Sequence, residues 1–143
     1  MGFSKLDLLR YMRSTNLGVI STVSPQGTPE AALVGIATAD DHRVIFDTTT
    51  TTRKHANLMH SPAVALVIAG PGEKTLQYEG RATEVPTSGA KGSDLREQYY
   101  LAWPDGRDRL AWPDLTYWCI EPVWARYCDY DCVPPLIAEF GWP

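Results

Sequence analysis

Five consecutive threonines, Thr48 to Thr52, lead directly into Arg53 and Lys54 at the start of a predicted short helix. The helix dipole already makes this end positive, so two cations there are unfavourable unless an anion binds beside them. Threonine hydroxyls, free backbone N–H groups and cationic side chains are the donors that a phosphate group needs. The pattern therefore predicts a phosphate site. It also permits a simpler interpretation, in which Thr51 or Thr52 caps the helix and both cations point into solvent.

The residues that usually carry metal or nucleophile chemistry are sparse. Among the three cysteines, Cys128 and Cys132 are four residues apart, with no second pair and no histidine nearby. We interpret them as structural thiols and expect no metal site. The three histidines (His42, His55 and His60) show no metal-ligand spacing, and no Ser/His/Asp or Cys/His arrangement indicates a nucleophile. The catalytic residues therefore stay unassigned.

The elements that must position the threonine run are mostly short strands joined by tight turns. We predict strands over residues 17–23, 31–37, 44–48, 63–68, 74–84, 117–120 and 123–127, and helices over 4–16, 53–60 and 94–102. This order predicts a mainly β fold, an antiparallel barrel with small helices at its ends. The strand over 31–37 is nearly all apolar and should be covered on both faces. In strand 74–84, Thr75 and Gln77 lie on the polar face, which either meets solvent or lines a ligand site.

Composition sets the broad class of the protein. The 143 residues, 44% of them hydrophobic, suit a single domain over residues 1–143. A net charge of −4 argues against nucleic acid as the main partner. No run reaches the length of a membrane span and no secretion signal is visible, so we expect no membrane partner. The odd, small number of cysteines fits a reducing compartment, and we expect a cytoplasmic protein. All five tryptophans follow residue 100. Such a concentration of aromatic residues fits either a subunit interface or an ordinary core.

Several motifs appear together in one order. A Gly27-Thr28-Pro29 hairpin is followed by an apolar strand, a strand ending in Thr48, the step Thr52-Arg53-Lys54, then Leu58 and a proline, Pro62, that opens another apolar strand. In this order the chain resembles the pyridoxamine 5′-phosphate oxidase-like family of FMN-binding split-barrel proteins.

The resemblance implies a split β-barrel of six antiparallel strands in a Greek-key arrangement, with short peripheral helices. It implies that the cofactor is FMN, held at the interface of a homodimer. The implied phosphate ligands are Thr48, Thr52, Arg53 and Lys54, and the implied neighbours of the flavin ring are Thr75 and Gln77. The implied function is that of an oxidoreductase acting on a small organic substrate, which the sequence does not identify.

Two departures from the family pattern narrow this expectation. An arginine and a lysine that reach the cofactor in the oxidase correspond here to Ala32 and Ala37, and the tail lacks the Arg-x-His element that grips a phosphorylated substrate. We therefore expect a substrate other than pyridoxamine phosphate. The aromatic residues Trp112, Tyr117, Trp118 and Trp124 suggest a flat, largely apolar substrate. Two alternatives stay open. One is a reductase of the same fold that uses an 8-hydroxy-5-deazaflavin, and the other is a non-catalytic flavin- or haem-binding protein.

Overall fold

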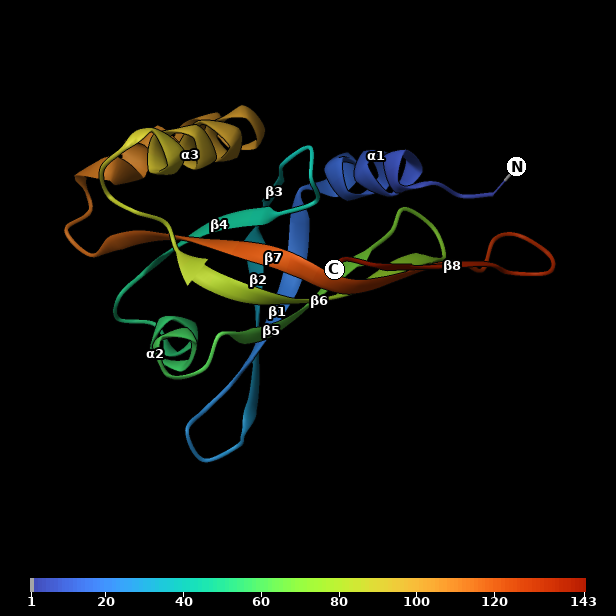
Figure 1. Ribbon diagram of the computed structural model, residues 1–143, viewed down its shortest axis with the longest axis horizontal. Helices are drawn as coiled ribbons and strands as arrows, with labels where there is room; N and C mark the ends of the chain where they lie inside the picture. Colours follow the sequence, from blue (N-terminus) through green and yellow to red (C-terminus); the bar gives the residue numbers. More distant parts are fainter. Residues whose placement is uncertain (1) are drawn as a thin grey trace.

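The structure, a computed structural model, describes residues 2–143 (Figure 1). Its elements in chain order are α1 (Lys5–Thr15), β1 (Leu17–Val23), β2 (Pro29–Gly35), β3 (Ala37–Thr38), β4 (Val44–Thr49), α2 (Arg53–His60), β5 (Ala63–Ala69), β6 (Lys74–Glu84), α3 (Ala90–Ala102), the 3₁₀ helix η1 (Pro104–Ala111), β7 (Leu115–Asp129) and β8 (Leu136–Gly141). All the strand pairs are antiparallel. Among the helices of residues 2–143, none has the length and apolarity needed to cross a bilayer.

The sheet closes on itself because of the order of its strands. That order is β2-β1-β5-β6-β7-β4-β3, with β8 paired to β7. The two end strands, β2 and β3, are consecutive in the sequence and separated only by Ile36. The sheet must therefore curl until its ends meet, and the buried Ile36 donates its backbone N–H to the backbone oxygen of Asn16 at this junction (2.9 Å). The mainly β split-barrel expectation is confirmed, with eight strands in place of six.

Apolar side chains fill the inside of the curled sheet. Phe46, Leu66, Tyr78 and Ile120 are at most 1% exposed and belong to one cluster. At one end α1 adds Leu8 and Met12 to this cluster, and at the other α2 adds Leu58. Tyr11 of α1 reaches the backbone oxygen of Ile68 near the end of β5, whereas α2 leads directly into the start of β5. The two helices thus cover opposite openings of the barrel, as the sequence predicts.

A second core lies outside the barrel. It forms where α3 packs on β3, β4 and β7, and the aromatic rings of Tyr99, Tyr100 and Tyr117 meet there edge to face. The hydroxyls of Tyr100 and Tyr117 are 2.7 Å apart. Figure 1 shows α3 along one side of the sheet, away from α2. The β4–β7 half of the sheet is therefore covered on both faces.

Four sequence predictions about elements need correction. Helix α3 begins at Ala90, four residues before the predicted start. The two last predicted strands form one, β7, which runs through Pro122 because a bulge opposite Glu79 and Gly80 removes the need for its N–H. Strand β8 was not predicted, because two prolines precede it. The strand over 31–37 breaks at Ile36, and its outer face is not covered within one chain.

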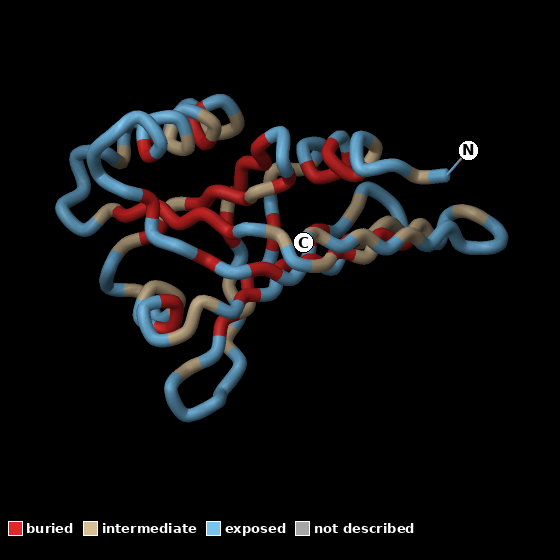
Figure 2. Tube along the Cα trace, in the orientation of Figure 1, coloured by how far each residue is buried: buried red, intermediate tan, exposed pale blue. Residues whose placement is uncertain are grey.

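The uncovered surface, here called the outer apolar face, comprises Leu17, Val19, Ala31, Leu33, Ala65 and Val67. These residues point away from the barrel interior, and Leu33 is 68% exposed. Leu33, Val19 and Val67 pair in one row across β2, β1 and β5, and Gln77 of β6 continues it. The β1–β2 hairpin extends beyond this face and is exposed at its tip (Figure 2). A contiguous exposed apolar surface of this kind usually marks an interface.

Candidate functional site

The start of α2 is capped by Thr52. Its Oγ1 accepts a hydrogen bond from the backbone N–H of His55 (3.3 Å) and donates one to the backbone oxygen of Thr49 (3.0 Å). The Thr48 hydroxyl lies 3.0 Å from the same Oγ1, and since the Thr52 proton is directed at Thr49, Thr48 is the donor. The threonine run therefore joins the end of β4 to the helix cap. The capping interpretation is correct for Thr52.

The capped helix end borders a cavity of about 380 Å³. The first N–H groups of a helix have no partner within it, and here they belong to Arg53 and Lys54. The lining comes from β1, β2 and the entry to α2: Ile20, Thr22, Glu30, Ala31, Ala32 and residues 51–54. Three of the four predicted phosphate ligands line this cavity, and Thr48 lies behind Thr52. Ala32 lines it too, where the resemblance places an arginine.

Lys54 is a half-buried cation in this cavity. Burial lowers the pKa of its ammonium group, and the nearby Asp47 carboxylate raises it in part. Across residues 2–143, Lys54 forms no ion pair. A desolvated cation without a counterion is costly, and an anion bound at the start of α2 would remove that cost. This observation fits the phosphate of FMN.

The cavity also contains a carboxylate that the sequence did not indicate. Glu30 of β2 pairs with Arg53 (Nη1 to Oε2, 3.2 Å) and accepts a hydrogen bond from Nδ2 of Asn57 (2.8 Å). The same Nδ2 donates to Oγ1 of Thr22 (3.0 Å). The available signal was that Glu30 is the one charged residue in an otherwise apolar strand. The pairing of Glu30 with Arg53, by contrast, is visible only in the tertiary structure.

An ion pair fixes the end of β4 from the other side of the sheet. Nε of Arg109 in η1 donates to Oδ2 of Asp47 (2.7 Å), and the Tyr99 hydroxyl donates to Oδ1 (3.0 Å). Nη2 of Arg109 also donates to the Tyr99 hydroxyl (3.1 Å). The Arg109 and Asp47 side chains are only 21% and 14% exposed. This network fixes β4 at Asp47, the residue before Thr48. The Asp47 carboxylate is also the negative charge near Lys54.

The two residues predicted to lie near a flavin ring do not line this cavity within one chain. Ile20 and Ala32 of the cavity lining pair with each other, and their row continues through Leu66 to Tyr78 of β6, next to Gln77. Ile20 and Tyr78 are buried and face the barrel interior, so Gln77 points to the opposite side of the sheet. Thr75 and Gln77 instead lie on the sheet surface that continues the outer apolar face. One chain therefore does not bring the predicted ring contacts to the predicted phosphate ligands.

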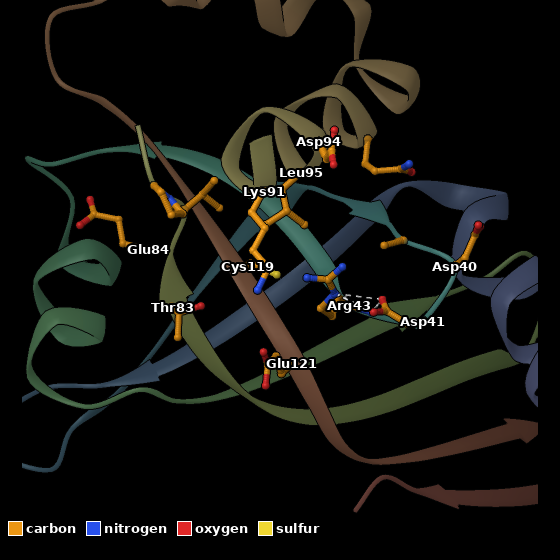
Figure 3. Close-up of a pocket in the computed structure, with 14 residues that line it drawn as sticks. Asp40, Asp41, Arg43, Thr83, Glu84, Lys91, Asp94, Leu95, Cys119 and Glu121 are labelled. Atoms are coloured by element: carbon orange, nitrogen blue, oxygen red, sulfur yellow. Dashed lines mark hydrogen bonds and ion pairs between the residues drawn. The ribbon is translucent and has the colours of Figure 1, made fainter. Parts of the chain in front are cut away.

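A second cavity, of about 470 Å³, lies between α3, β7 and the β3–β4 turn (Figure 3). Five carboxylates line it against two cations, and Asp41 already binds the guanidinium of Arg43 (2.8 Å). Burial raises the pKa of the Cys119 thiol in its lining to about 11, so this group is protonated at neutral pH. The excess of negative charge disfavours an anionic ligand here. Within residues 2–143, no group of three or more His, Cys, Asp or Glu side chains could hold a metal ion.

Solved structures with similar folds include haem-binding and FMN-binding proteins. The haem-binding protein of Mycobacterium smegmatis has a TM-score of 0.78 at 19% identity, over 93% of this chain, and this chain spans 57% of that protein. HutZ, the haem storage protein of Vibrio cholerae, has a TM-score of 0.73 at 15% identity, over 85% of this chain and 91% of that one. A pyridoxamine 5′-phosphate oxidase-related, FMN-binding protein of Nostoc punctiforme has a TM-score of 0.70 at 14% identity, over 97% of this chain and 95% of that one. Identities this low establish the fold alone.

The sequence itself matches a family profile over most of its length. A comparison with curated proteins finds no match. Residues 7–129, by contrast, match the profile described as pyridoxamine 5′-phosphate oxidase. This range extends from α1 to the end of β7 and contains the whole cavity at the start of α2. The chain therefore belongs to the pyridoxamine 5′-phosphate oxidase family.

Proposed function

We propose that this protein binds FMN through the cavity at the start of α2 and acts as an FMN-dependent oxidoreductase on a small organic substrate. The observation that carries the proposal is Lys54, a half-buried cation at the positive end of a helix that forms no ion pair with any of residues 2–143. Family membership supports the same ligand. Bound FMN supplies hydride or electron transfer, and the protein supplies its position and its electrostatic surroundings.

The residues at the helix start divide the work of holding the phosphate. Backbone N–H groups of Arg53 and Lys54 donate to it, and the two cationic side chains balance its charge. Thr52 fixes the position of the donors by capping the helix, and Thr48 holds Thr52 through their hydrogen bond. In this arrangement a phosphate that is bound at the helix end replaces solvent around Lys54.

A homodimer completes the site in this proposal. Two copies that meet through the outer apolar face cover Leu33 and its neighbours, which a single chain leaves exposed. Gln77 continues the same row of side chains, and Thr75 lies on the same side of β6. The second copy can thus supply Thr75 and Gln77 to a flavin ring whose phosphate is held by the first. This accounts for their absence from the cavity lining within one chain.

Titration of FMN tests the phosphate site. We expect Arg53→Ala to weaken FMN binding by at least tenfold, because one charge-assisted contact contributes about 1.5–3 kcal/mol. Arg10→Ala is the matched control, since Arg10 is an exposed arginine on α1, away from the cavity. Flavin fluorescence gives both affinities. Equal FMN affinity for wild type and Arg53→Ala would contradict the proposed site.

The second candidate function is a non-catalytic flavin- or haem-binding protein. Two features of the cavity favour it: the absence of a cationic side chain at Ala32, and the carboxylate of Glu30. The absorption spectrum and mass of the molecule that co-purifies with the protein separate flavin, deazaflavin and haem. Turnover of the flavin-loaded protein with a reduced nicotinamide and a planar acceptor such as a quinone then separates an enzyme from a carrier.

A further inference from the structure

Glu30 places a negative charge inside a cavity that is otherwise suited to an anion. Its side chain is 18% exposed, whereas that of its partner Arg53 is 74% exposed. Asn57, itself 4% exposed, binds the carboxylate through Nδ2 and ties it to Thr22 of β1. The carboxylate is therefore fixed by buried neighbours, and the arginine is the solvent-exposed member of the pair.

The charges in the cavity do not balance a phosphate monoester. Arg53 and Lys54 contribute two positive charges and Glu30 one negative charge, among the lining residues. A phosphate monoester carries between about −1.5 and −2 at neutral pH. Such a group competes with Glu30 for Arg53 and is repelled by the carboxylate that remains. A ligand with a smaller charge at this position meets less repulsion.

We propose that Glu30 determines ligand specificity at this cavity: by occupying Arg53 and repelling a second anion, it weakens the binding of phosphorylated ligands relative to uncharged ones. The inference rests on the proposed function, since FMN and riboflavin are the ligands that make it measurable. The two molecules share the ring and the ribityl chain and differ only in the phosphate. Their affinity ratio therefore reports the charge discrimination at the start of α2.

The test uses Glu30→Gln, which keeps the length of the side chain and an oxygen that can accept from Asn57. Glu97→Gln is the matched control, because Glu97 is an exposed carboxylate on α3, outside the cavity. Fluorescence titration of FMN and of riboflavin gives an affinity for each protein. We expect Glu30→Gln to bind FMN about 10- to 100-fold more tightly than wild type, since like-charge juxtaposition strongly rejects a ligand. Riboflavin affinity and the Glu97→Gln values should stay unchanged.

Each outcome separates this inference from the proposed function. If wild type binds FMN and Glu30→Gln binds it equally or more weakly, the specificity role is refuted while the FMN site stands. The inference is also refuted if the variant gains the same factor for riboflavin, because the phosphate is then not the group discriminated. Failure of both wild type and Glu30→Gln to bind FMN at millimolar concentration overturns the proposed function together with this inference. Thermal unfolding of each variant confirms that it is folded during the titrations.

Discussion

The ion pair between Asp47 and Arg109 ties η1 to the end of β4, and its removal should destabilise the fold measurably. The substitution Asp47→Asn preserves shape but replaces a charged acceptor with an amide. An amide has one acceptor oxygen, so in this position the asparagine can accept from Nε of Arg109 or from the Tyr99 hydroxyl but not from both, and the charge-assisted character of the 2.7 Å contact is lost. The guanidinium then retains the neutral Tyr99 hydroxyl (3.1 Å) and the carboxylate of Asp105, which is 3.3 Å away and 61% exposed.

The expected cost follows from the contacts and their burial. A hydrogen bond to a charged group contributes about 1.5–3 kcal/mol, and an unsatisfied buried donor costs about 1–3 kcal/mol more. Asp47 and Arg109 are 14% and 21% exposed, so solvent screens part of this loss. We expect the free energy of unfolding to fall by about 2–3 kcal/mol. For a chain of this length that corresponds to a thermal midpoint lower by roughly 6–12 °C.

A double-mutant cycle provides the assay. Urea unfolding of Asp47→Asn, Arg109→Met and the double variant gives three free energies, and the coupling between the two sites should exceed about 1 kcal/mol. Arg10→Met on α1 is the control, since the Arg10 side chain is 71% exposed and its only ion pair within residues 2–143 is a 3.7 Å contact with Asp7. A loss below about 1 kcal/mol for Asp47→Asn, or additive single effects, would refute the reasoning.

Three further predictions concern other sites. Because burial lowers the pKa of Lys54, its charge destabilises the free protein at neutral pH, and this penalty disappears as pH rises through the lowered folded pKa toward the ordinary value of 10.5. Lys54→Met should therefore be at least as stable as wild type at neutral pH, and its gain in unfolding free energy should shrink at alkaline pH, as urea unfolding at several pH values can show. The same variant should bind FMN more weakly in a fluorescence titration. In the proposed homodimer, Leu33→Glu should convert pairs of 15.9 kDa chains into monomers in light scattering, whereas Leu101→Glu should not, although Leu101 on α3 is more exposed (78% against 68%). Iodoacetamide should modify the half-exposed Cys132 before Cys119, whose burial raises its pKa to about 11, and faster labelling of Cys119 would contradict the buried environment.

Local sequence signals determined most of the strands and the helix at the site. The predicted bounds of β1, β6 and α2 agree with the structure, because alternation, a proline at position 62 and the threonine cap act within a few residues. The same signals do not predict the structure where contacts between residues far apart in the sequence determine it. Pro122 breaks no strand because the bulge near Gly80 accommodates it, and β8 forms because β7 offers a free edge.

The candidate site divides in the same way. Thr52, Arg53 and Lys54 line one cavity because they are consecutive at one helix end, which a sequence pattern can reveal. Glu30 enters that cavity only because α2 packs beside β2, and its pairing with a residue 23 positions away has no local signature. Thr75 and Gln77 are predicted near the same ligand, but their side chains lie on the outer side of the sheet, opposite the buried Ile20 of the cavity lining. In the proposed homodimer a second copy brings them to the ligand, and such an arrangement leaves no signal within one sequence.

The central position of β7 has a consequence for how the chain is made. Among the strands of residues 2–143, only β7 joins β4 and β3 to the four strands β2, β1, β5 and β6 by strand pairing. While the ribosome is still synthesising residues before 115, a four-stranded sheet and a separate small hairpin have no shared partner. Their unpaired edges are exposed for that interval, which is when newly made β proteins are most prone to aggregate. The threonines at the end of β4 thus reach their final position only when the last fifth of the chain emerges, so a product truncated before β7 lacks the closed barrel as well as the tail.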